Sequence, residues 1–249
     1  MPITLTFKDR IAEIVFDHPP VNAFDTTGWE ALPRIIHQAA SNPEARCILI
    51  RAEGRGFCAG VDIKEMQSHP ERIAKLNRDN YLTFKAIRDA EIPVVGALHG
   101  FVIGGGVNIA GACDVLIAAE GAYLSLPEID RGAMGGAAFL SRMAPVQKVR
   151  AAFFTGGRIR VEDLQVYGAI EKVVPAADLH AEALAFCATI AAKSRVALVI
   201  AKQALNLIEP TNPSDRYRIE QGFTLEMYAE EDSQKARDAF VENGKQAAF

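Results

Sequence analysis

The hydrophobic pattern of the chain changes along its length, from short strand-like runs near the start to helical periodicity at the end. Residues 4–7 and 11–16 alternate between apolar and polar positions around Lys8-Asp9-Arg10, which predicts a β-hairpin. After the Pro19-Pro20 breaker, we expect a helix near 27–40, a strand over 46–51 and a polar helix over about 70–90. Strands and helices then alternate up to Val174, which is the order typical of α/β folds.

From Ala177 onward the pattern is wholly helical. Helices are expected over 177–192, 195–208, 213–228 and 231–243, with breaks at Pro210 and Pro213. A helical tail that follows an α/β core often serves as a cover or an assembly surface. We therefore expect two parts, a core over residues 1–190 and a helical region over residues 191–249 that packs on it.

Composition narrows the classes of function. With 249 residues, of which 49% are hydrophobic, the chain can bury one large core. A net charge of −4 without a basic stripe argues against nucleic acid or an anionic membrane as the main partner. No apolar run approaches the ~20 residues of a membrane-spanning helix, and the N-terminus lacks a secretory signal. These features predict a cytoplasmic protein that binds small molecules and copies of itself.

The four cysteines, Cys47, Cys58, Cys113 and Cys187, are widely spaced. They show neither metal-ligand nor redox-pair spacing. We interpret each as a small core residue in a reducing compartment, and we expect no metal site.

The glycine triplet Gly104-Gly105-Gly106 is the first candidate site. An apolar strand, 93–98, leads into it, and a helix of small residues, 107–112, follows. Glycine lets a ligand approach the backbone, and the free N–H groups of a helix start stabilise a phosphate or a developing oxyanion. The flanking residues of a P-loop and of a dinucleotide fingerprint are missing, which argues against phosphate. Taken alone, the triplet fits tight helix–strand packing equally well.

A second glycine turn lies upstream, where Gly54, Gly56 and Gly60 follow the apolar strand 47–50. Two strand ends of this kind can face one another across a pocket. The runs FCAGVDIKEM, GFVIGGG and LPEIDRG, in this order, resemble the crotonase (enoyl-CoA hydratase/isomerase) superfamily, and the likeness extends from His18 to Phe240. The resemblance implies a crotonase-type ββα superhelix core for acyl-CoA binding and catalysis, with a C-terminal helical trimerisation region. It also implies a homotrimer or a dimer of trimers.

The same resemblance assigns chemistry to individual positions. The substrate would be an acyl-CoA thioester, with no cofactor beyond the coenzyme A moiety of the substrate. The oxyanion hole would consist of the backbone N–H groups of Val61 and Gly105, which would stabilise a thioester enolate. Further substrate contacts would come from the motifs and the tail, at Ala59, Gly60, Asp62, Ile63, Lys64, Gly104, Gly136 and Phe240.

The reaction depends on side chains above the oxyanion hole. Typical hydratases of the superfamily carry two glutamates, and the matching positions here are Asn108 and Glu128. Asparagine can orient water or a carbonyl but cannot take a proton, so syn-hydration should be crippled. We therefore expect Glu128 to be the base and Asn108 to be a positioning group, in an enzyme other than an ordinary hydratase.

Coenzyme A requires basic groups for its phosphates. Lys64 and Phe240 match positions that bind coenzyme A in relatives, but the usual lysine three places after that Phe is Asn243 here. Lys245 could substitute, although a solvated tail lysine is the favoured interpretation.

A narrower resemblance concerns the runs RAEGRGFCAGVDIKEMQ, LPEIDRGAMG, Leu140-Ser141-Arg142 and 216–226. They are similar to crotonase-type hydrolases that open the last steroid rings in bacterial cholesterol and bile-acid breakdown, acting on a bicyclic dione CoA thioester. This implies that Glu128 activates a water that adds to a ring ketone, after which a retro-Claisen step breaks the adjacent carbon–carbon bond. Asp130, Arg131 and Arg142 would contact the ketones or the product carboxylate, unless the first two form a plain surface ion pair.

Three alternatives remain at this point. A Δ3,Δ2-enoyl-CoA isomerase would also need only Glu128, to shuttle a proton, and a hydratase-like lyase stays possible. A pseudoenzyme that binds acyl-CoA without turnover is the alternative of another class, although the presence of Glu128 argues against it. In the tail, the run RYRIEQGF is favoured as an amphipathic helix at a subunit contact over a direct substrate role.

Overall fold

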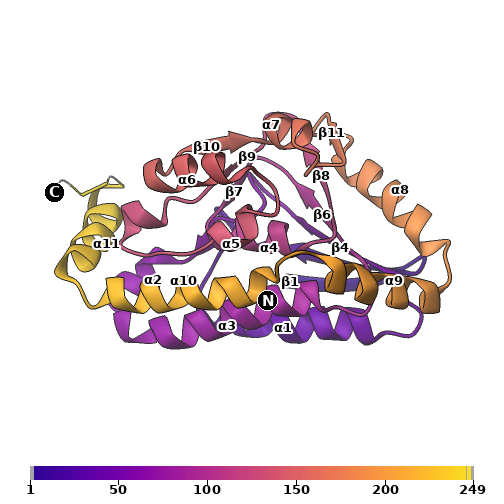
Figure 1. Ribbon diagram of the computed structural model, residues 1–249, viewed down its shortest axis with the longest axis horizontal. Helices are drawn as coiled ribbons and strands as arrows, with labels where there is room; N and C mark the ends of the chain where they lie inside the picture. The colour runs from indigo at the N-terminus through magenta and orange to yellow at the C-terminus, as the bar shows by residue number, and fades with distance from the viewer. Residues whose placement is uncertain (1–2, 245, 248–249) are drawn as a thin grey trace.

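The computed structural model describes residues 3–244 and 246–247 (Figure 1). Its main sheet has six strands in the order β1-β2-β4-β6-β8-β11. The hairpin of β1 (Ile3–Lys8) and β2 (Ile11–Phe16) is antiparallel, and β4 (Cys47–Ala52), β6 (Val94–Leu98), β8 (Val115–Ala119) and β11 (Lys172–Val174) continue the sheet in parallel. The inner strands are near-continuous apolar runs because helices or small sheets cover both faces.

Short strands beside the main sheet complete a repeating pattern. β7 (Phe101–Ile103), β9 (Tyr123–Ser125) and β10 (Arg158–Arg160) form a three-stranded sheet, and β3 (Ala23–Phe24) pairs with β5 (Gly60–Val61). A long strand, a short strand and a helical segment thus follow one another three times, beginning at β4, β6 and β8. This arrangement confirms the expected ββα core.

Helices cover the two faces of the sheet. On one face, α1 (Thr26–Ser41), α3 (Ile73–Arg88) and α4 (Gly105–Ala112) enclose the larger apolar core, in which Trp29 and Phe84 are fully buried. On the other face, α8 (Leu179–Ala191) packs on a smaller cluster that includes Leu49, Val95 and Ile117. Both faces are buried, as parallel strands require.

The remaining helical segments lie around the edges. They are α2 (Ile63–Ser68), η1 (Pro70–Arg72), η2 (Glu128–Arg131), α5 (Ala137–Leu140), α6 (Val146–Thr155) and α7 (Val161–Val166). The tail comprises α9 (Arg195–Ile208), α10 (Pro213–Tyr228) and α11 (Glu231–Asn243). In Figure 1, α10 runs along α3, and α11 closes the end of the molecule beside α2. The four late helices begin and end within two residues of the predicted ranges.

Two details differ from the sequence-based expectation. The run Phe101–Ile103 forms the short strand β7, which the apolar pattern did not predict, and α4 begins at Gly105 within the glycine triplet instead of at Val107. The expected polar helix over 70–90 is split, because a 3₁₀ turn precedes α3. The four cysteines are free and buried, as predicted for core residues.

No single helix in the described part of the chain has both the length and the hydropathy that crossing a bilayer requires. Taken together, α8 and α9 pass that test by length and composition, and they meet at a bend of 103°.

A buried lysine attaches the tail to the core. Lys202 of α9 is 3% exposed and donates to the carbonyls of Ile87 and Ile92 and to Asp114 Oδ2 at 2.8 Å. The same Asp114 oxygen accepts from the Val94 N–H, at the start of β6. One ammonium group therefore joins α9 to the end of α3 and to the segments that lead into β6 and β8.

We expect Lys202→Met to lower the free energy of unfolding by about 3 kcal/mol, because two buried carbonyls and a carboxylate lose their partner. Chemical denaturation measures the change. The exposed Lys193 provides the matched control, and Lys193→Met should change stability by less than ~0.5 kcal/mol. Equal losses in the two variants would contradict a stabilising role for this contact.

Candidate active site

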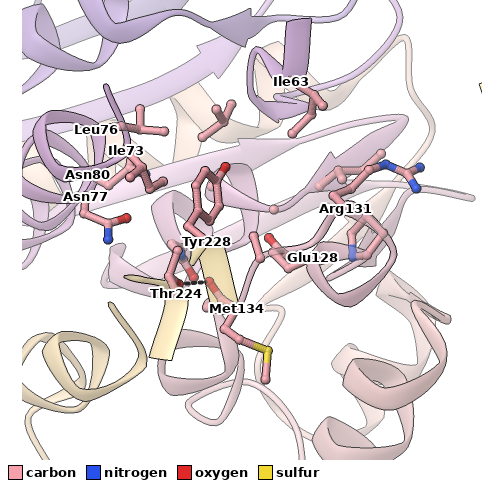
Figure 2. Close-up of a pocket in the computed structure, with 18 of the residues that line it drawn as sticks. Ile63, Ile73, Leu76, Asn77, Asn80, Glu128, Arg131, Met134, Thr224 and Tyr228 are labelled. Atoms are coloured by element: carbon pink, nitrogen blue, oxygen red, sulfur yellow. Dashed lines mark hydrogen bonds between the residues drawn. The ribbon is translucent and has the colours of Figure 1, made fainter. Parts of the chain in front are cut away.

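The two predicted glycine turns meet at a cavity of about 220 Å³. Its wall comes from the loop before α2, from α3, the start of α4, η2 and the loop after it, and the tail helices α10 and α11. Figure 2 shows Ile63, Ile73 and Leu76 on one side, with Glu128 and Met134 across from them. Most of the wall is apolar, and a few polar groups lie within it, as in a site for an organic ligand.

Glycines bring the two backbone segments into direct contact. A methyl group placed at Gly60 (φ +84°) would lie 2.9 Å from the Gly105 nitrogen, so no larger residue fits there. Gly105 is the first residue of α4, where N–H groups have no partner within the helix. Val61 and Gly105 both line the cavity, so the two residues predicted as backbone donors border the same space.

Glu128 begins η2 and lies directly against the glycine triplet. A methyl group at Gly104 (φ +56°) would be 2.9 Å from Glu128 Oε1. Oε2 is buried and has no hydrogen-bond partner among the described residues. Burial, together with the nearby charge of Glu220, raises the pKa of Glu128 to about 8, although its own backbone N–H and Arg131 act in the opposite direction. A carboxyl group with such a pKa can exchange protons near neutral pH.

Two asparagines add buried polar atoms to the same cavity. Asn108 of α4 is 3% exposed and Asn80 of α3 is 5% exposed. The Oδ1 atom of each is buried without a partner in the described part of the chain, as is Glu128 Oε2. Because unpaired buried acceptors are costly, these three atoms indicate a site that a polar ligand or water completes.

Arg131 and Phe240 form a contact at the edge of the cavity, where the guanidinium lies 3.7 Å from the centre of the ring. The neighbouring Asp130 points elsewhere. A methyl group at Gly156 would lie 2.6 Å from Asp130 Oδ2, and Asp130 is not among the lining residues. Of the two predicted substrate contacts, Asp130 and Arg131, Arg131 lines the cavity and Asp130 does not.

Of the other predicted contacts, Ala59, Ile63 and Gly104 line the cavity. Gly60 lies behind it against Gly105, and Asp62 caps α2 by accepting from the Lys64 N–H at 2.9 Å. Lys64 itself is exposed at the start of that helix. Gly136 does not line the cavity, but a methyl group there would approach Asn108 Oδ1 to 3.2 Å.

Arg142 corrects one expectation, because the structure places it away from the cavity. Its Nε donates to Glu209 at 2.6 Å, and its Nη1 donates to the carbonyls of Gly111 and Cys113 at the end of α4. Arg142 therefore joins α4 to the tail and offers no group to a ligand beside Glu128. The suggested lysine, Lys245, lies outside the described residues.

Sequence reasoning missed several wall residues from helices far away in the chain. Asn77 and Asn80 project from α3, and Thr224 and Tyr228 project from α10 (Figure 2). Tyr217 of α10 also lines the cavity. The spacing of the two asparagines, three apart on an otherwise core-facing helix, is the one signal that was available. In residues 3–244 and 246–247, no group of three metal-ligating side chains is found.

Comparisons with known proteins agree with this geometry. The family model for enoyl-CoA hydratase/isomerase matches residues 6–248. A (7aS)-7a-methyl-1,5-dioxo-2,3,5,6,7,7a-hexahydro-1H-indene-carboxyl-CoA hydrolase from Rhodococcus jostii is 41% identical over 98% of this chain and 96% of its own length. The protein of the same name from Mycobacterium tuberculosis is 41% identical over 97% of this chain and 99% of its own.

Among solved structures, an enoyl-CoA hydratase/isomerase from Xanthobacter autotrophicus Py2 superposes with a TM-score of 0.90. The superposition covers 98% of this chain and 94% of that chain, at 21% identity. At this identity, the likeness is one of fold alone.

Proposed function

Because the chain belongs to the enoyl-CoA hydratase/isomerase (crotonase) family of CoA-thioester enzymes, we propose that it hydrolyses a carbon–carbon bond in a ring. The substrate class would be a bicyclic dione carried as a CoA thioester, as in the names of the two relatives at 41% identity. Each alignment covers nearly the whole of both proteins, which supports assigning the reaction class of these relatives to this chain.

The observation that carries the proposal is the polar content of the cavity around one carboxyl group. Glu128 shares the cavity with Asn108, which cannot accept a proton, and Asn80 contributes a further buried oxygen without a partner among the described residues. A linear enoyl chain has no group that could pair with these atoms, so its binding would leave them desolvated at a cost of about 1–3 kcal/mol each. A hydrated ring ketone and a bound water carry the O–H donors that these acceptors need.

The residues fit a sequence of steps in which protons and electrons balance. Glu128, once ionised, takes a proton from water, and the water oxygen adds to the ring ketone carbon. Asn108 orients either this water or the ketone. The adjacent carbon–carbon bond then breaks, its electron pair moves toward the thioester, and the ketone carbon becomes a carboxylic acid. The N–H groups of Val61 and Gly105 stabilise the enolate oxygen, and the proton held by Glu128 returns to the carbon.

The test is a parallel incubation of the purified protein with a bicyclic dione CoA thioester, crotonyl-CoA and 3-hexenoyl-CoA. The products are followed by liquid chromatography with mass detection, so that an isomer of unchanged mass is recognised by its retention time. We expect the dione to gain the mass of one water and the other two to remain unchanged. Conversion of 3-hexenoyl-CoA without reaction of the dione would identify an isomerase instead, since one carboxylate suffices for that proton shuttle. Rapid hydration of crotonyl-CoA would contradict the role given to Asn108.

We further propose that coenzyme A lies along the edge formed by Arg131 and Phe240, near the exposed Lys64. We also propose a cytoplasmic homotrimer or dimer of trimers, assembled through the tail region 191–249. Exposed apolar side chains on α9 and α10 support an interface there: Val196, Ile200, Leu205, Leu207, Ile208, Ile219 and Phe223. Light scattering would show a monomer if this assembly were wrong.

A further inference from the structure

The loop between Glu128 and α5 is held in place by side chains of the tail. Thr224 of α10 donates to the Met134 carbonyl, and Ser233 of α11 donates to the Gly132 carbonyl. Glu220 of α10 accepts two further hydrogen bonds at the end of this loop. Three tail residues, between 82 and 101 positions away in the sequence, thus fix the segment that follows the candidate base.

Of these three tail residues, Glu220 is the one with an ionisable side chain. Its Oε2 accepts from the Gly136 N–H at 3.0 Å, and its Oε1 accepts from the Ala138 N–H at 3.0 Å. These N–H groups belong to the start of α5, where a helix provides no partner of its own. Both carboxylate oxygens are used, so the side chain fixes the direction of the backbone as well as its distance.

This contact matters because the loop is rich in glycine and is therefore costly to hold in one conformation. Gly132, Gly135 and Gly136 have φ values of +67°, +131° and +96°, and glycine loses more backbone entropy on ordering than other residues do. A methyl group at Gly136 would come within 3.2 Å of Asn108 Oδ1. A shift of this loop would therefore be transmitted to Asn108 on one side and to Glu128 on the other.

We propose that Glu220 is a positioning residue for the reaction. By anchoring the first turn of α5, it keeps the loop after Glu128 at a fixed position relative to Asn108. This role rests on the proposed function of Glu128 as the base. Glu220 does not line the cavity, so it acts through the loop and not by contact with the substrate.

The charge of Glu220 supplies a second link to Glu128. α5 carries no ionisable side chain, and the part of α3 that lines the cavity carries Asn77 and Asn80, which do not ionise. The charge of Glu220 acts on Glu128 and Tyr217, and Arg150 lines the same surface groove as Glu220. Burial raises the pKa of Glu220 to about 7, and the N–H groups of α5 oppose this rise. Near pH 8, Glu220 is therefore ionised, and its charge makes Glu128 harder to ionise.

Glu220→Gln tests the proposal because it keeps the shape, removes the charge and exchanges one acceptor for an amide donor. We expect the midpoint of the Glu128 titration, followed by ¹³C-carboxyl NMR and assigned with Glu128→Gln, to fall by about half a pH unit. Turnover of the CoA thioester should fall about tenfold in kcat with a smaller change in KM, because the base is misplaced.

Two controls separate this role from general destabilisation. Ser233→Ala removes an uncharged tether of the same loop and should leave the Glu128 midpoint at its wild-type value while lowering Tm. Glu226→Gln removes an exposed carboxylate from the same helix and should change neither Tm nor the midpoint. An unchanged Glu128 midpoint in Glu220→Gln, or an unchanged kcat, would overturn the proposal.

Failure of the proposed reaction would be recognised separately. Wild-type protein that leaves the dione unchanged refutes the ring-opening function, whereas the NMR titration of ligand-free protein still reports whether Glu220 acts on Glu128.

Discussion

Replacing Glu128 with glutamine is expected to lower turnover about 10³-fold while raising the stability of the folded protein at alkaline pH. Glutamine keeps the size of the side chain beside Gly104 but cannot take a proton from water. Substrate binding should change little, because the backbone donors at Val61 and Gly105 are untouched. Steady-state kinetics should therefore show the loss in kcat, with KM close to the wild-type value.

The stability gain follows from the burial of the carboxyl group. The pKa of Glu128 is about 8 in the folded protein, against 4.5 as its ordinary value. Below pH 4.5 the group is neutral in both states and contributes nothing to a pH dependence. Between pH 4.5 and 8 only the unfolded chain releases the proton, so wild-type stability falls by up to about 1.4 kcal/mol per pH unit. Above pH 8 the folded state also ionises, and the loss levels off.

Calorimetry at pH 5 and pH 8.5 checks whether the stability of the wild-type protein falls as the pH rises. The Tm of Glu128→Gln should exceed the wild-type Tm by more at pH 8.5 than at pH 5. Glu226→Gln, on the exposed face of α10, is the matched control and should show no such widening. A gap that is constant with pH would mean that the Glu128 carboxyl is solvated in the ligand-free protein.

Gly105→Ala is the second substitution with a large expected effect, because a methyl group at this position has no room. It would lie 2.7 Å from Cζ2 and Cη2 of Trp29, whose ring is fully buried and packs edge-on against Phe24 and Phe84. Overpacking of this kind costs about 1–3 kcal/mol. The start of α4 must move, and with it the N–H group that would hold the enolate oxygen.

Loss of one such donor lowers kcat about 10²–10³-fold, so we expect a fall in that range together with a lower Tm. Gly222→Ala is the matched control, since a methyl group there meets nothing within 4 Å and the residue is exposed on α10. It should leave turnover unchanged and add about 0.5–1 kcal/mol of stability. If Gly105→Ala kept wild-type kcat despite a lower Tm, the start of α4 would not be the oxyanion site.

Periodicity predicted the large elements because each is long enough to show it. The tail helices repeat over several turns, and β1 and β2 alternate around a polar turn. β7 escaped prediction because three apolar residues between Gly100 and Gly104 carry no period. The start of α4 was misplaced since glycine, a poor helix former, occupies its first two positions.

The site was predictable where it is built from local motifs. Val61 and Gly105 follow glycine turns that the sequence displays, and Asn108 and Glu128 were found through the resemblance of the surrounding motifs to a known family. The structure brings all four to one cavity. Tyr217, Thr224 and Tyr228 reach that cavity through helix packing, which residue spacing does not encode. Arg142 was misinterpreted for the same reason, because its partner Glu209 lies 67 residues away.

α10 and α11 complete a cavity whose other walls come from earlier parts of the chain. A nascent chain synthesised as far as about residue 210 contains every strand of the main sheet, together with Glu128, Asn108 and both glycine turns. It still lacks one wall of the cavity and all three tethers of the Glu128 loop. A chain that stopped before α10 would therefore carry every side chain assigned to the reaction and lack the parts that enclose and position them.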